Sequence, residues 1–131
     1  MPIDAAKLKH WPFPPIVHTY SARDTILYAL GVGLGHDPMD RAQLRFVYED
    51  GLQALPTLAV VLGYPGFWAK DPATGIDWVK LLHGEQSLGL HAPLPAEGTV
   101  VYLLETFSGP PNFQINTAQR LSLAACRSGS A

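Results

Sequence analysis

Twelve prolines and twelve glycines are spread along this 131-residue chain, and they divide it into short elements joined by turns. Proline ends a helix or interrupts a strand ladder, and glycine marks turns and places where the backbone of a neighbour comes close. Such a composition is unusual for a small helical protein. One helix near the start, followed by several short antiparallel strands, predicts a single α+β domain.

The composition excludes several classes of protein. Hydrophobic residues make up 47% and charged residues 15%, which predicts a globular protein with a real core. The net charge of −2 and the scattered basic residues argue against a surface for nucleic acid or for an anionic membrane. Apolar runs are far shorter than the roughly 18 residues of a membrane span. With one cysteine, Cys126, and no apolar leader, we expect an intracellular protein.

A helix is predicted from Ala22 to about Leu34. Ser21 and Asp24 have the spacing of a capping box, in which each end residue bonds the backbone of the other. Three glycines between residues 31 and 35 are expected to end the helix. Its apolar stripe is predicted to face the sheet as the central buried element. The stripe consists of Ile26, Leu27, Leu30 and Leu34.

Alternation of apolar and polar residues predicts strands at residues 44–49, 87–94 and, most strongly, 99–107. The apolar run that ends at residue 63 suits a helix or a buried strand, and periodicity does not separate these for so short a run. Residues 64–75 are rich in glycine and proline and are predicted to form a loop.

The sequence does not support a nucleotide-binding loop, a metal site or a reactive cysteine. The glycines of residues 31–35 end a helix and have the wrong spacing for a nucleotide-binding loop. The five histidines show no metal-ligand spacing, so we expect no metal, and His10, His36 and His91 suit ordinary surface positions. Cys126 lacks a histidine close in the sequence and is expected to be inert.

One polar cluster is more distinctive. His83, Glu85 and Gln86 bring three hydrogen-bonding side chains to the point where an apolar helix is expected to meet a strand. Polar groups in such a place either satisfy buried backbone groups or face a ligand. On the residues alone, the structural role is favoured.

Taken in order, several segments resemble the N-terminal half of type 2 enoyl-CoA hydratases, which are MaoC-like dehydratases. The similarity runs over about residues 11–105, and its strength lies in the order and register of the pieces. The matching pieces are YSARDTILYALGVG at 20–33, LRFVYE at 44–49, LPT at 55–57, PGF at 65–67, HGEQ at 83–86 and PLP at 93–95.

The resemblance implies a hot-dog fold, in which an antiparallel sheet wraps a central helix, and two such domains in each subunit. It also implies reversible addition of water to a trans-2-enoyl-CoA, giving a (3R)-3-hydroxyacyl-CoA without a cofactor, in peroxisomal fatty acid β-oxidation. The substrate-binding residues expected from it are Tyr20, Asp24, His83, Glu85 and Gln86.

The catalytic motif of that family, Tyr-Ser-Gly-Asp-x-Asn-Pro-Leu-His, lies in its C-terminal half and is degenerate here. Tyr20 and Ser21 match its start, but Arg23 falls on the catalytic Asp and Tyr28 on the catalytic His. A tyrosine, with an ordinary pKa near 10, is a poor substitute for histidine as a general base. We therefore expect no catalytic residue in this chain, and whether it is an enzyme by itself stays open.

The C-terminal end departs from the family as well. Residues 1–107 are expected to form the hot-dog domain, incomplete at its C-terminal end, and residues 108–131 an atypical tail. A sheet that lacks two strands exposes an edge, so a homo-oligomer or pairing with a catalytic hot-dog domain is expected. The leading interpretation is a non-catalytic half that accommodates the acyl chain. The alternatives are a small active hydratase working as a homodimer through Asp24 and His83, and a non-enzymatic module that binds a full-length hydratase.

Overall fold

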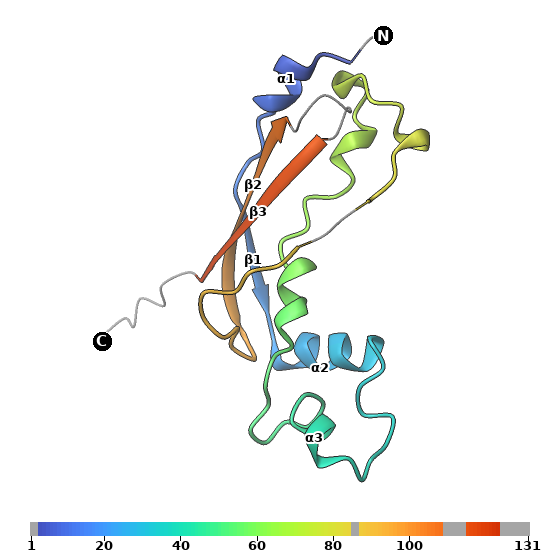
Figure 1. Cartoon of the computed structure of the whole chain (residues 1–131). Coiled ribbons are helices and arrows are strands. Elements are labelled where there is room, and N and C mark those ends of the chain that lie inside the picture. Colours follow the sequence, from blue (N-terminus) through green and yellow to red (C-terminus); the bar gives the residue numbers. More distant parts are fainter. Residues whose placement is uncertain (1–2, 85–86, 109–114, 124–131) are drawn as a thin grey trace, which may run out of the picture.

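A three-stranded antiparallel sheet forms the body of the protein in the computed structural model, which describes residues 3–84, 87–108 and 115–123. The strand order is β1-β2-β3, with β1 at Ile16–Tyr20, β2 at Gly98–Ser108 and β3 at Ile115–Leu123. Figure 1 shows helix α1 at one end of the sheet and helices α2 and α3 at the other. The helices are α1 (Ala5–Lys9), α2 (Ala22–Gly31), α3 (Arg41–Leu44) and the 3-10 helices η1 (Pro56–Val60), η2 (Trp68–Lys70), η3 (Pro72–Thr74) and η4 (Trp78–Lys80).

The central strand β2 confirms the strand predicted at residues 99–107. It pairs with β1 from Ile16 opposite Tyr102 to Tyr20 opposite Gly98, so β1 covers only its first half. Strand β3 runs along β2 from residue 100 to residue 108. Because β3 lies beyond residue 107, the sheet extends into the segment expected to be an atypical tail. The division into a domain and a tail remains a prediction, and Cys126 lies outside the described residues.

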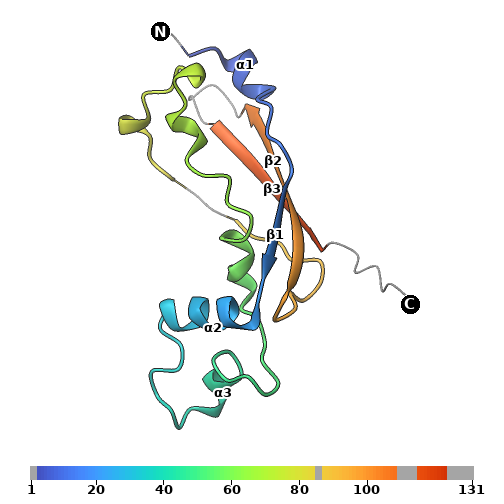
Figure 2. The ribbon, with the colours of Figure 1, turned by 180° about the vertical axis from the view of Figure 1, so that it is seen from behind.

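The core lies on one face of the sheet. Val100, Tyr102 and Leu104 alternate along β2 and are all buried on this face. Leu58 and Leu62, from η1 and the turn after it, pack with Val100 and with Tyr20 of β1. In Figures 1 and 2 the segment with η1 runs alongside the strands. The architecture is therefore the expected α+β hot-dog half, and its core helical element is the short η1.

Helix α2 begins where the capping residues predict and ends at Gly31, three residues before the expected end. Gly33 and Gly35 take positive φ angles of 95° and 77°, which favour glycine and end the helix. The prediction that Ile26, Leu27 and Leu30 are buried against the sheet is wrong for Leu27 and Leu30, which are 54% and 48% exposed, whereas Ile26 is half-buried. The buried residues of α2 are Thr25 and Ala29, which lie on a different face of the helix.

The strand predicted at residues 44–49 is wrong. The Asp40 side chain accepts a hydrogen bond from the backbone N–H of Ala42 and begins helix α3 there. Beyond α3 the backbone N–H groups of residues 46–48 donate to the carbonyls of Gln43 and Leu44, so the chain continues in helical turns. The alternation of apolar residues could not reveal this cap.

The strand predicted at residues 87–94 is wrong as well. The segment has no regular structure, and Leu88 and Leu90 are exposed. A strand needs a partner for its backbone groups, and the part of the chain that the structure describes pairs no strand with this segment. Of the two alternatives for the apolar run ending at residue 63, the helix is the one observed, as η1. Among the described residues, no helix combines the length and apolar character needed to cross a membrane.

Candidate functional site

Two buried hydroxyl groups join the start of α2 to the turn before β2. The Tyr20 hydroxyl donates to the carbonyl of Pro95 at 2.7 Å, and the Thr25 hydroxyl donates to the carbonyl of Ala96 at 2.6 Å. Both side chains are almost fully buried. Burial raises the pKa of the Tyr20 phenol, which therefore remains a neutral donor. Tyr20, an expected substrate-binding residue, thus has its hydroxyl engaged with the carbonyl of Pro95.

Asp24 completes the predicted capping box and lies at the surface. Its carboxylate accepts a hydrogen bond from the backbone N–H of Ser21 at 2.7 Å and another from the Ser21 hydroxyl at 2.9 Å. The backbone N–H of Ser21, followed by its hydroxyl, lowers the pKa of the Asp24 carboxyl below its ordinary value. A lowered pKa makes the carboxylate a weaker proton acceptor, and the oxygen bonded by Ser21 is already engaged, so Asp24 is poorly suited to act as a general base.

His18 was not identified from the sequence, although it contributes a specific contact. Its Nδ1 atom accepts a hydrogen bond from the backbone N–H of Gly63 at 2.9 Å. The residue precedes Tyr20 by two positions on β1, so both side chains lie on the core face of the strand. A polar residue at an inward position of a strand was the signal that could have revealed it.

The HGEQ segment is only partly described. His83 is exposed and follows η4, and the neighbouring Leu82 is 89% exposed. Glu85 and Gln86 lie outside the described residues. The structure brings Tyr20 and Asp24 together at the start of α2, where their hydrogen bonds go to Pro95 and Ser21 rather than to His83. The assignment of these residues to substrate binding remains a prediction.

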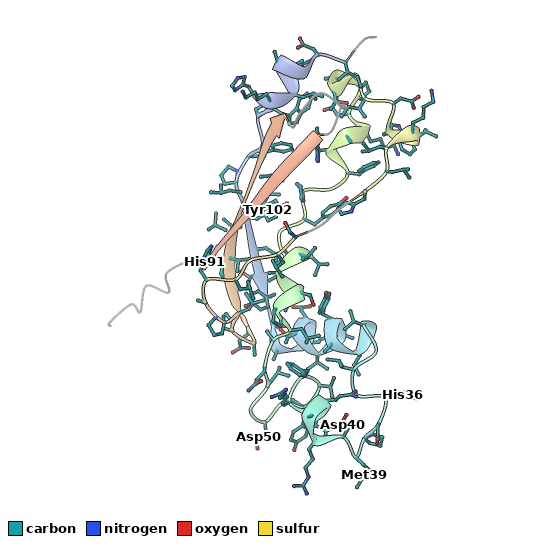
Figure 3. All side chains as sticks on the ribbon, in the orientation of Figure 1. His36, Met39, Asp40, Asp50, His91 and Tyr102 are labelled. Carbon is teal, nitrogen blue, oxygen red and sulfur yellow. The ribbon has the colours of Figure 1, made fainter. Side chains whose placement is uncertain are left out.

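The surface histidines occupy separate places. His10, His36 and His91 are exposed, as expected. Figure 3 shows His36 beside Met39 near helix α3, and His91 beside the sheet. Within residues 3–84, 87–108 and 115–123, no group of three histidine, cysteine or acidic side chains is arranged to hold a metal ion.

All three tryptophans lie in two aromatic clusters. Trp68 packs edge-on against Phe13, with ring centroids 5.2 Å apart, and lies 6.2 Å from Trp11. Phe67 and Trp78 form a second edge-on pair at 6.0 Å. Phe67 and Trp78 are close to half exposed, so they contribute apolar surface. Such groups can bind an apolar ligand or partner, and they supply no nucleophile or base.

This chain is similar to a family of known proteins. The family model described as "MFE-2 hydratase 2 N-terminal domain" matches residues 18–109. A "Probable enoyl-CoA hydratase 2" of Dictyostelium discoideum is 37% identical over 109 residues, which cover 77% of this chain and 35% of that protein. The "Enoyl-CoA hydratase 2, peroxisomal" of Arabidopsis thaliana is 36% identical over 102 residues, covering 67% of this chain and 31% of the relative.

A bacterial relative extends the comparison. The "3-hydroxyacyl-thioester dehydratase Y" of Mycobacterium tuberculosis is 39% identical over 95 residues, covering 70% of this chain and 31% of that protein. The chain thus spans about a third of the length of these curated relatives. The matched region contains the end of β1 and all of α2, η1 and β2, and therefore the core cluster of Tyr20, Leu58, Leu62 and Val100. The chain belongs to the family of MFE-2 hydratase 2 N-terminal domains, within the enoyl-CoA hydratase 2 proteins.

Proposed function

We propose that this chain is the non-catalytic half of an (R)-specific 2-enoyl-CoA hydratase of the MaoC-like dehydratase type, and that it accommodates the fatty acyl chain. The printed names of the relatives support the hydratase and dehydratase chemistry. The observation that carries the non-catalytic role is the occupied cap at the start of α2, where the Asp24 carboxylate is bonded by Ser21.

The degenerate motif supports the same role. Arg23 and Tyr28 occupy the positions at which the catalytic Asp and His stand in the family motif. Tyr28 packs against the core cluster, and Arg23 is exposed on the first turn of the helix. Neither side chain provides an acid–base pair that could activate water near neutral pH.

A turnover assay tests this proposal. The purified chain is mixed with crotonyl-CoA or decenoyl-CoA, and loss of the conjugated thioester absorbance is followed beside a full-length relative as positive control. We expect no hydration above background. Robust turnover that disappears in Asp24→Asn would instead establish the small active hydratase that works through Asp24 and His83.

We further propose that the chain associates, either with a second copy or with a catalytic hot-dog domain, and that it acts in peroxisomes, as the Arabidopsis relative's name suggests. Val100 and Leu104 face the chain's own core, so their side chains are unavailable to a partner. The outer face of the sheet retains Val17, 68% exposed, and Leu103, 36% exposed. An exposed apolar patch on a sheet favours association.

Sedimentation across a dilution series tests the association, with Leu103→Lys as the disrupting variant. Leu82→Lys is the matched control, because Leu82 is exposed but lies outside the sheet. We expect Leu103→Lys alone to shift the chain toward monomer. A monomer at high micromolar concentration would contradict association with a second copy. An equal effect of both variants would instead place the contact outside the sheet.

A further inference from the structure

The hydrogen bond between His18 and Gly63 joins two segments that are far apart in the sequence. Gly63 lies directly after the apolar segment that contains η1, and its backbone N–H donates to the Nδ1 atom of His18 on β1 at 2.9 Å. Leu58 and Leu62 of the same segment are buried against Tyr20 and Val100. The bond therefore fixes the C-terminal end of the segment that covers the sheet's apolar face.

The close packing at Gly63 makes this bond specific. Gly63 has a φ of +69°, and a Cβ atom at this position would lie 2.5 Å from the Cβ of Tyr102. Tyr102 is buried in the middle of β2 and cannot move away easily. The backbone of Gly63 therefore approaches the sheet as closely as a glycine allows. This packing restricts the orientation of its N–H and hence the acceptors that it can reach.

An imidazole nitrogen accepts a hydrogen bond only when it carries no proton. The observed bond therefore requires neutral His18 with its proton on Nε2. In the imidazolium form both ring nitrogens are donors, so Nδ1–H would oppose the Gly63 N–H. Protonation abolishes this contact and places two donors against each other.

Few charged groups face His18 within the described residues. On α2, the Asp24 carboxylate interacts electrostatically with His18 and with its neighbour Arg23. The other titratable groups on the packed elements whose side chains the structure describes are the phenols of Tyr20, Tyr28, Tyr64 and Tyr102, and a phenol has an ordinary pKa near 10. Protonated His18 thus loses Gly63 and gains an attraction toward the start of α2.

We propose that His18 is a proton-operated latch. Neutral His18 holds Gly63 against the sheet, and protonation releases this segment and opens the apolar face beneath Leu58 and Leu62. Histidine is the side chain type whose charge ordinarily changes between pH 8 and pH 5, so acidification over this range is the trigger to apply. This latch does not depend on the proposed function, because it follows from a contact within the chain.

Nuclear magnetic resonance of the whole ¹⁵N-labelled chain tests the latch directly. At pH 8 we expect the His18 ring to be the Nε2–H tautomer, and the Gly63 amide resonance to shift with the same midpoint as the His18 ring on acidification. An Nδ1–H tautomer, or a Gly63 resonance that does not change between pH 8 and pH 5, would overturn the proposal. These readouts need no variant.

Two substitutions sharpen the test. His18→Asn places a non-titrating amide oxygen near the position of Nδ1, so the Gly63 resonance should become independent of pH. His36→Asn is the matched control, because His36 is exposed and distant from β1, and it should leave the titration intact. We also expect the thermal midpoint of the wild type to fall by roughly 3–6 °C more than that of His18→Asn between pH 8 and pH 5.5. Equal losses in both proteins would count against the latch.

Discussion

Replacing Gly63 with alanine tests the tight approach of the η1 segment to the sheet. The added Cβ would lie 2.5 Å from the Cβ and 2.9 Å from the Cγ of buried Tyr102. Carbon atoms in contact normally lie about 3.5–4.0 Å apart, so the segment or the tyrosine must shift. The substitution leaves the backbone N–H in place, so the His18 hydrogen bond loses no donor.

The destabilisation expected for Gly63→Ala has two parts, and a matched control separates them. A non-glycine residue at φ near +69° is strained by about 1–2 kcal/mol. Forcing an extra carbon into a packed core costs about 1–3 kcal/mol more. Gly51 has nearly the same φ of +68°, and nothing lies within 4 Å of a Cβ built there. Gly51→Ala therefore carries only the first part, and Gly63→Ala should destabilise by about 2–5 kcal/mol.

Urea and thermal unfolding measured on both variants give the comparison. Each 1 kcal/mol corresponds to a shift in thermal midpoint of roughly 3–5 °C for a chain of this size. The difference between the two variants isolates the contact with Tyr102, because the effect of alanine on the unfolded chain is the same in both. If Gly63→Ala and Gly51→Ala lose the same stability within about 0.5 kcal/mol, the close approach described for Gly63 is incorrect.

Three further substitutions have defined outcomes in unfolding experiments. Thr25→Val keeps the shape of the side chain but removes the bond to the carbonyl of Ala96, and it should cost about 1–3 kcal/mol; a neutral result would mean that water replaces the hydroxyl. Leu62→Ala, in the core, should cost about 2–5 kcal/mol, whereas half-exposed Leu30→Ala should cost under about 1 kcal/mol; the reverse order would restore α2 as the central helix. Asp24→Asn should destabilise near neutral pH and progressively less on acidification below about pH 4, because a lowered carboxyl pKa stabilises the fold only while the group is ionised; a difference from wild type that persists at pH 2 would show that the charge is not responsible.

Features that depend on neighbouring residues could be predicted from the sequence. The start of α2 follows from Ser21 and Asp24, which satisfy each other within one turn, and its end follows from glycines with positive φ. The long strand β2 follows from a run of β-branched and aromatic residues. The family followed from ordered segments, and the match over residues 18–109 confirms it.

The failed predictions share a different cause. Residues 87–94 alternate like a strand, yet a strand forms only when another backbone satisfies its N–H and C=O groups, and alternation carries no information about that partner. Strand β1 shows the reverse case, because five residues that were not predicted as a strand pair with β2. In both segments, the presence or absence of a neighbouring strand determined whether the residues form a strand.

By itself, the sequence determined the family, the α+β class, the capped start of α2 and the position of the central strand, since each depends on local spacing or on ordered motifs. Only the tertiary structure decided which side chains became buried. Thr25 is inside and Leu30 is half outside because the Thr25 hydroxyl meets the carbonyl of Ala96, 71 residues away. His18 acquired its acceptor role in the same way, from a glycine 45 residues along the chain. Such contacts depend on where distant backbone groups are placed in space, and no local pattern of residues encodes that placement.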